Sequence, residues 1–183
     1  MSVVFDESGM RFGSFSDAQV CRIERSKAYL SVRQHVKIAD FILLRKRPQK
    51  PDMLFVVEAK SSAPHPENKE HFREYVSSVQ EKLCNTLALY IAMRVGRIGA
   101  PAEELPQDLR ASPLDAMEFR LVLVINGFPD EHLDPVKLAL QQSLPAAQRR
   151  IWRLGPHPIF VLNDAAARVH RLLVQQEAST STT

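Results

Sequence analysis

The chain has 183 residues, of which 45% are hydrophobic and 25% charged, and its formal net charge is +3. This composition is that of an ordinary soluble domain with a sizeable core, and no apolar run approaches the roughly 18 residues that a membrane span requires. The small positive charge permits a polyanionic partner but does not demand one.

The first residues lack the basic start and the long apolar stretch of a signal peptide. Cys21 and Cys84 form no metal-type cluster, and free thiols are the default state in the cytosol. We therefore expect a cytoplasmic protein with free thiols and no membrane partner.

The N-terminal segment predicts a group of short strands. These cover residues 3–24 and are broken at Gly9 and Gly13. Ser26 is a favourable N-cap for a short helix that runs to about Gln34.

Two apolar runs, residues 36–44 and 54–60, are the most informative part of the sequence. A polar segment with two prolines separates them and predicts a hairpin connection. In a strand, alternate residues face the same way, and both runs are apolar on both faces. We therefore expect them to be adjacent central strands of a sheet.

The second half of the chain predicts alternating helices and strands. Residues 67–95 predict the longest helix, because apolar side chains recur at three- and four-residue spacing. The other expected elements are an exposed loop at 100–115, a buried strand at 119–125, a helix at 130–144, a short strand at 151–154, a core strand at 158–162 and a last helix from the cap Asn163 to about Gln175.

The order of these elements predicts the α/β class. We expect a single domain over residues 1–177, with a mixed β-sheet flanked by helices. The segment 178–183, rich in Ser and Thr, is expected to be a disordered tail.

Three charged residues stand on the two apolar runs. Because unpaired burial of a charge costs several kcal/mol or more, Asp40, Glu58 and Lys60 need partners. The midpoint of positions 40 and 58 is 49, inside the hairpin connection, so a symmetric hairpin places the two acids roughly 5 Å apart on one face. The length of the connection also allows a slip of two residues, which would lengthen this distance. Carboxylates that close raise each other's pKa unless a cation lies between them. The pattern points to a divalent metal and a phosphodiester.

At these residues the chain resembles the PD-(D/E)XK, or restriction-endonuclease-like, nuclease superfamily. Asp40, Glu58 and Lys60 match the motif, and Ala39 stands where the name-giving proline would be. The resemblance implies a restriction-endonuclease-like core whose second and third strands carry a metal-dependent nuclease centre. It further implies that Asp40 and Glu58 bind Mg²⁺ or Mn²⁺ and that Lys60 acts on the nucleophile. The simpler alternative is a strand-end acid and an exposed Glu–Lys pair.

Members of the superfamily often carry an additional acid upstream. Glu24 is the best-placed match, as a further metal ligand of the catalytic site, and Glu7 is the second choice. A surface acid paired with Arg22 or Lys27 explains Glu24 equally well. Some members also place a Gln or Lys on the following helix, where Gln80 is the candidate, although a solvated helix residue is the favoured interpretation.

Two basic clusters could contact phosphates. They are Arg45, Lys46, Arg47 and Lys50 in the hairpin connection, and Arg149, Arg150 and Arg153 further on. A solvated turn and a helix end explain them more simply.

Two functions stay open. The first is a Mg²⁺- or Mn²⁺-dependent nuclease that hydrolyses nucleic acid, with DNA favoured over RNA, alone, as a homodimer or in a larger complex. The second is a catalytically inactive nuclease-like module that binds a partner protein or nucleic acid. Zinc-type His pairs, the G-x-S-x-G elbow, the P-loop and G-x-G-x-x-G are all missing from the sequence, so the corresponding enzyme classes lack their chemistry.

Overall fold

The computed structural model describes residues 1–98 and 102–175. Within them the chain forms one mixed α/β domain around a five-stranded sheet in the order β3-β4-β5-β6-β7. These strands are β3 (Val20–Cys21), β4 (Phe41–Arg45), β5 (Met53–Lys60), β6 (Glu118–Ile125) and β7 (Ile159–Asn163). Antiparallel pairing joins β3, β4 and β5, and parallel pairing joins β5, β6 and β7, which confirms a mixed sheet.

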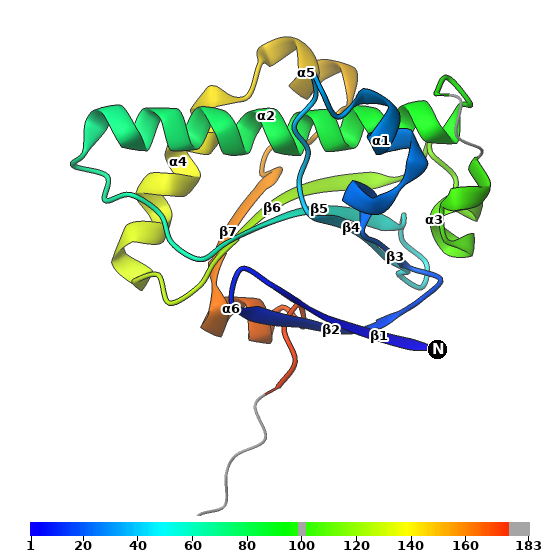
Figure 1. Cartoon of the computed structure of the whole chain (residues 1–183), viewed down its shortest axis with the longest axis horizontal. Helices are drawn as coiled ribbons and strands as arrows, with labels where there is room; N and C mark the ends of the chain where they lie inside the picture. The colour runs from blue at the N-terminus through cyan, green and yellow to red at the C-terminus, as the bar shows by residue number, and fades with distance from the viewer. Residues whose placement is uncertain (99–101, 176–183) are drawn as a thin grey trace, which may run out of the picture.

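Helices and a separate hairpin cover the two faces of this sheet (Figure 1). One side carries α1 (Lys27–Val32), α2 (Lys69–Arg94), α4 (Leu133–Ser143) and α5 (Ala146–Ile151). The other side carries the two-stranded hairpin of β1 (Ser2–Glu7) and β2 (Met10–Ser16), together with α6 (Asp164–Val169). The remaining short elements are η1 (Ile23–Arg25), η2 (Ala102–Glu104), α3 (Gln107–Ala111) and η3 (Asp130–His132).

The central strands are buried on both faces, as the sequence predicts. Ile42 and Val56 pack into the core beneath α2, where Leu83 and Leu87 are fully or almost fully buried. On the other face, Phe41, Leu43, Val57 and Ala59 pack against the β1–β2 hairpin, whose apolar residues include Met10, Phe12 and Phe15. The sheet therefore separates two apolar cores. A charged side chain on one of its central strands needs a partner or a place at a strand end.

The long helix α2 links β5 to β6 and lies across the sheet (Figure 1). It confirms the helix predicted at 67–95. No helix in the described part of the chain combines the length and the apolar character needed to cross a membrane. The two predicted caps are also confirmed: Ser26 Oγ accepts from the Tyr29 N–H at 3.1 Å, and Asn163 Oδ1 accepts from the Ala166 N–H at 2.9 Å.

Other element predictions were wrong. Residues 151–154 form the end of α5 and a turn rather than a strand, because the N–H groups of Trp152 and Leu154 donate back to the carbonyls of Gln148 and Arg149. The segment 102–115 is not simply an exposed loop, since it contains η2 and α3. Leu105 and Leu109 of this segment pack into the core.

The last helix is shorter than predicted. It ends at Val169, and the chain then turns back to pair with β2. Gly13 N–H donates to the Leu172 carbonyl at 3.1 Å, and Val174 N–H donates to the Arg11 carbonyl at 3.0 Å. Contacts with another element thus outweigh the local helical pattern. The predicted tail at 178–183, the C-terminal limit of the domain at 177, and residues 99–101 of the expected loop lie outside the described residues.

Candidate functional site at the end of the central hairpin

The register of the β4–β5 hairpin confirms its predicted symmetry. Phe41 pairs with Val57 and Arg45 with Met53, so the ladder is centred on position 49. One further step would place Asp40 opposite Glu58. The backbone bends at Asp40 instead, and the Asp40 N–H donates to the Val57 carbonyl at 3.1 Å.

Asp40 closes this end of the hairpin with its side chain. Its Oδ2 atom accepts the N–H of Ala59 at 2.7 Å, which holds the carboxylate beside the C-terminal end of β5. The residues before it do not continue the strand that was predicted from residue 36. They bond to α2 instead: Ala39 N–H donates to Thr86 Oγ1 at 2.7 Å, and Asn85 Nδ2 donates to the Lys37 carbonyl at 3.0 Å.

Glu58 is fully buried, at 0% exposure. Its Oε1 atom accepts from Lys60 Nζ at 2.8 Å and from Lys82 Nζ at 2.7 Å. Its Oε2 atom is also buried and has no hydrogen-bond partner among the described residues. Two ammonium groups offset the charge of a buried carboxylate, while one of its oxygens remains free to accept.

Asp40 and Glu58 lie close enough to affect each other's charge. Burial raises the pKa of Asp40 to about 7, and the negative charge of Glu58 is the next largest cause. Glu7 adds a smaller upward effect, while the Ala59 N–H and Lys82 act in the opposite direction. A carboxyl group that titrates near neutral pH beside a second acid is the electrostatic situation that a bound cation relieves.

Lys82 is a component of the site that the sequence analysis did not identify. It lies on α2, three residues after the buried Val79 and four before the buried Thr86, so it belongs to the helix face that meets the sheet. Burial alone would lower the pKa of Lys82, but the hydrogen bond and the charge of Glu58 hold it above its ordinary value. A lysine within an apolar helical stripe is the sequence signal that could have revealed it.

Gln80, the residue considered on this helix, makes a contact of another kind. Its Nε2 atom donates to the Sγ of Cys84 on the next turn at 3.2 Å. The residue of α2 that contacts Glu58 is thus Lys82, two positions further on.

Tyr75 contributes a second polar atom without a partner. Its hydroxyl is buried and bonds to nothing in the described part of the chain. Burial, followed by the charge of Glu58, raises the pKa of Tyr75. Tyr75 lies seven residues before Lys82 on α2, two turns along the same face.

Glu24 lies in an ion-pair group next to the site. It binds Arg22 at 2.7 Å and lies 3.8 Å from Arg25, and Arg22 also binds Glu7 Oε2 at 3.1 Å. The pairing with Arg22 is the one that a surface acid was expected to make. Of the two upstream acids, Glu7 is the one whose charge raises the pKa of Asp40. The structure thus brings Asp40, Glu58 and Lys60 together, whereas Glu24 is paired with Arg22 and forms no three-acid group with Asp40 and Glu58 in the described residues.

Basic residues of the hairpin connection bind acceptors within the protein. Arg45 donates to the carbonyls of His170 and Arg171, each at 2.9 Å. Lys46 binds Asp52 at 3.0 Å, and Arg47 binds Glu118 at 2.9 Å. These three side chains therefore have structural partners, which accords with the simpler interpretation of this cluster.

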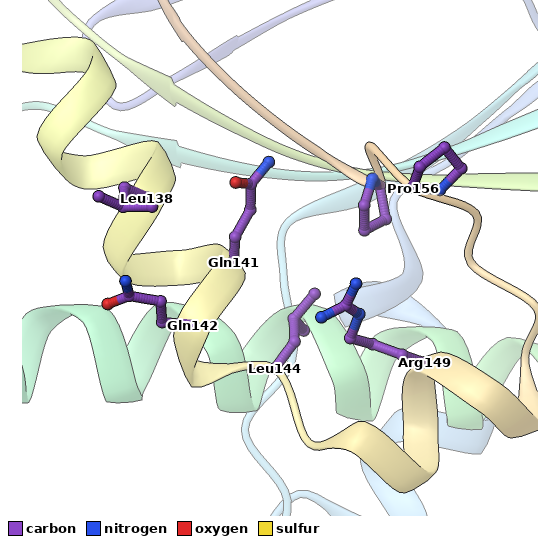
Figure 2. A pocket seen from close by; sticks show the side chains of 7 residues that line it. Leu138, Gln141, Gln142, Leu144, Arg149 and Pro156 are labelled. Carbon is purple, nitrogen blue, oxygen red and sulfur yellow. The ribbon is translucent and has the colours of Figure 1, made fainter.

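Several hollows of the surface have linings that include neither Asp40 nor Glu58. One of about 240 Å³ is bounded by α4, α5 and the residues that precede β7 (Figure 2). Its lining residues are Leu138, Gln141, Gln142, Leu144, Arg149, Pro156 and Pro158. None of them is an acid or a nucleophile, so this hollow has no chemistry comparable to that around Glu58.

Comparison with known proteins finds no match to a protein-family model, to a curated protein or to a solved structure. The described residues also contain no group of three or more His, Cys, Asp or Glu side chains that could hold a metal ion. A candidate cation site in this region therefore consists of two acids, Asp40 and Glu58, with other ligands supplied by water or substrate.

Proposed function

We propose that the protein is a metal-dependent nuclease that hydrolyses phosphodiester bonds, with DNA favoured over RNA as substrate. The observation that carries the proposal is the group of Asp40, Glu58 and Lys60 at one end of the central hairpin, where the buried Glu58 keeps one oxygen without a partner. The three side chains match the PD-(D/E)XK pattern in type and order. A mixed sheet with helices on one side of this hairpin is compatible with a restriction-endonuclease-like core.

The donor set fits Mg²⁺ or Mn²⁺. Both acids offer hard carboxylate oxygens, and Glu58 Oε2 is a buried acceptor with no other bond. Burial and the charge of Glu58 raise the pKa of Asp40, and a cation beside its carboxylate would oppose both effects. When bound, the metal would polarise the phosphoryl group and lower the pKa of a water ligand.

Lys60 has the position needed to act on the substrate side of the site. Its ammonium group contacts Glu58 and its side chain is 29% exposed, so Lys60 can reach both the carboxylate and a molecule arriving from solvent. A positive charge there can orient the attacking water and stabilise the charge that develops on the phosphate. Glu58 in turn fixes the position of the Lys60 ammonium group through their 2.8 Å contact.

A cleavage assay tests this function. The purified protein should cut DNA or RNA with Mg²⁺ or Mn²⁺ and should stop when EDTA is added. Glu58→Gln and Lys60→Ala should each reduce the rate by at least ~10²-fold. Lys69→Gln, at an exposed position at the start of α2, is the matched control and should cut as the wild type does. If Glu58→Gln and Lys60→Ala both cleave at the wild-type rate, the assignment of the site is wrong.

The inactive module is the second candidate, and two contacts favour it. Lys60 and Lys82 already offset the charge of Glu58 without a metal. In that case Mn²⁺ should not raise the melting temperature, and Asp40→Ala should stabilise the fold because it removes a poorly compensated acid. In a nuclease, Mn²⁺ should raise the melting temperature of the wild type and not that of Asp40→Ala.

A further inference from the structure

Glu58 Oε1 holds two ammonium groups that come from different parts of the fold. Lys60 stands two residues further along β5, whereas Lys82 reaches the same oxygen from α2. The two Nζ–Oε1 distances, 2.8 and 2.7 Å, are those of charge-assisted hydrogen bonds. Two lysines on one oxygen while the other oxygen has no partner is an uneven arrangement that calls for an explanation.

The backbone around Lys82 is firmly held. Thr86 Oγ1 donates to the Lys82 carbonyl at 2.7 Å and accepts the Ala39 N–H at 2.7 Å, so one buried hydroxyl ties this turn of α2 to the residue before Asp40. The side chain of Lys82, by contrast, is 23% exposed. Its ammonium group can therefore leave Glu58 while the helix stays in place.

The charges of the site balance without a metal. Asp40 and Glu58 carry two negative charges when both are ionised, and Lys60 and Lys82 carry two positive charges. A divalent cation added to this set would leave two positive charges uncompensated in a largely buried place, which is unfavourable. A phosphodiester offsets one of these charges, and the repulsion between Lys82 and the cation at Glu58 is relieved if Lys82 moves from the carboxylate to an oxygen of that phosphodiester.

From this balance we infer that Lys82 is an exchangeable counter-ion of Glu58, which leaves the carboxylate when a divalent cation binds and then donates to an oxygen of the phosphodiester. The inference rests on the proposed function and assigns a second phosphate-contacting residue to it. Lys82 rather than Lys60 is assigned as the mobile group because the proposed function already places Lys60 beside the attacking water. This exchange also couples metal binding to substrate binding, because the cation that displaces Lys82 from Glu58 makes its ammonium group available to the phosphodiester.

The test is a Mn²⁺ titration followed by the shift in melting temperature and by calorimetry, with Mn²⁺ alone as the ligand. Lys82→Gln should bind Mn²⁺ about tenfold more tightly than the wild type, because a competing positive charge is gone. At saturating Mn²⁺ the same variant should cut an oligonucleotide about 10- to 100-fold more slowly, because the phosphate loses a donor. Lys82→Met, which retains the apolar stem, serves as a second variant if the Gln variant folds poorly. Lys69→Gln is the matched control on the same helix.

The outcomes separate this inference from the proposed function. Mn²⁺ binding that is equal or weaker in Lys82→Gln and Lys82→Met overturns the exchange while the nuclease proposal stands. Mn²⁺ binding that appears only once Lys82 is replaced also overturns the exchange, because Lys82 then stays on Glu58 and excludes the metal. If neither the wild type nor any Lys82 variant binds Mn²⁺, both proposals fail.

Discussion

The two ends of the β4–β5 hairpin carry similar residues in opposite electrostatic states. At the loop end, Asp52 Oδ2 accepts from Lys46 Nζ at 3.0 Å and from Ser112 Oγ at 2.8 Å. Burial alone would raise the pKa of Asp52, but these hydrogen bonds and the charge of Lys46 hold it below its ordinary value. At the other end, burial and the charge of Glu58 raise the pKa of Asp40 to about 7.

This difference separates a structural cluster from a candidate site on the same pair of strands. Every contact of Asp52 lies within the protein and favours its charged form, so the loop end needs no ligand. The Asp40 end has a second acid, a buried oxygen without a partner and ammonium groups on the other oxygen of Glu58. Charged residues on apolar strands therefore indicate a site only where the protein leaves their interactions incomplete.

The sharpest way to break the comparison is to remove one acid from each end. Glu58→Ala should reduce cleavage by at least ~10³-fold and lower the free energy of unfolding by about 3 kcal/mol, since two partly buried ammonium groups lose their partner. Asp52→Ala should lower the free energy of unfolding by about 2 kcal/mol and leave cleavage unchanged. Urea unfolding and a cleavage assay on both variants measure these effects. If Asp52→Ala lost as much cleavage activity as Glu58→Ala, the distinction between a structural end and a functional end of the hairpin would be wrong.

The pH dependence of stability should have opposite signs at the two ends. Because the pKa of Asp40 is raised in the folded protein, the folded state binds more protons than the unfolded state between about pH 4 and 7. Its contribution to the free energy of unfolding is therefore largest at low pH and should fall by roughly 3 kcal/mol across that window. Asp52, with its lowered pKa, contributes stability that is lost as the pH falls through its folded pKa.

Unfolding curves from pH 4 to 8 check this prediction. Asp40→Asn should abolish the decline in stability towards neutral pH, while Asp52→Asn should flatten the loss on the acid side. A decline that persists in Asp40→Asn would show that another group causes it.

The link between α2 and the Asp40 segment should matter to a smaller extent. Thr86→Val removes the hydroxyl that joins the Ala39 N–H to the Lys82 carbonyl, so we expect a loss of about 1–2 kcal/mol in the free energy of unfolding. The altered position of Asp40 should also weaken Mn²⁺ binding several-fold. Thr86→Ser retains the hydroxyl and is the control. Unchanged Mn²⁺ affinity in Thr86→Val would mean that the link is purely structural.

The smallest effect is expected from Tyr75→Phe. Because its hydroxyl is buried without a partner, removal should raise the free energy of unfolding by about 0.5–1 kcal/mol. Tyr90→Phe is the matched variant on the same helix. Its hydroxyl donates to the Leu109 carbonyl at 2.9 Å and accepts from Arg94 at 2.8 Å, so its loss should lower stability by about 1 kcal/mol. Parallel denaturation of both variants compares the two, and a Tyr75→Phe variant less stable than the wild type would contradict the assignment.

The sequence predicts the hairpin and its register well because both follow from local patterns. The two continuous apolar runs and the position of the polar connection between them place the centre of the ladder at residue 49, where it is found. The start of β4 is less predictable. Residues 36–39 are as apolar as a strand, yet tertiary hydrogen bonds to Asn85 and Thr86 draw them away from the sheet.

The electrostatics of the site depends on contacts that no local pattern encodes. Lys82 lies 24 residues from Glu58 along the chain, and only the packing of α2 on β5 brings its ammonium group to the carboxylate. The same applies to Glu7, which approaches Asp40 because the β1–β2 hairpin folds over the second face of the sheet. The motif therefore identifies Asp40, Glu58 and Lys60, and the tertiary structure adds the groups that set their charge.

An anomalous difference map from a crystal soaked in Mn²⁺ tests the central claim most directly. The account predicts one strong peak bonded at about 2.2 Å to carboxylate oxygens of both Asp40 and Glu58, with Lys82 displaced from Glu58. No peak between these two residues at saturating Mn²⁺, with Lys60 and Lys82 still on Glu58, would contradict it.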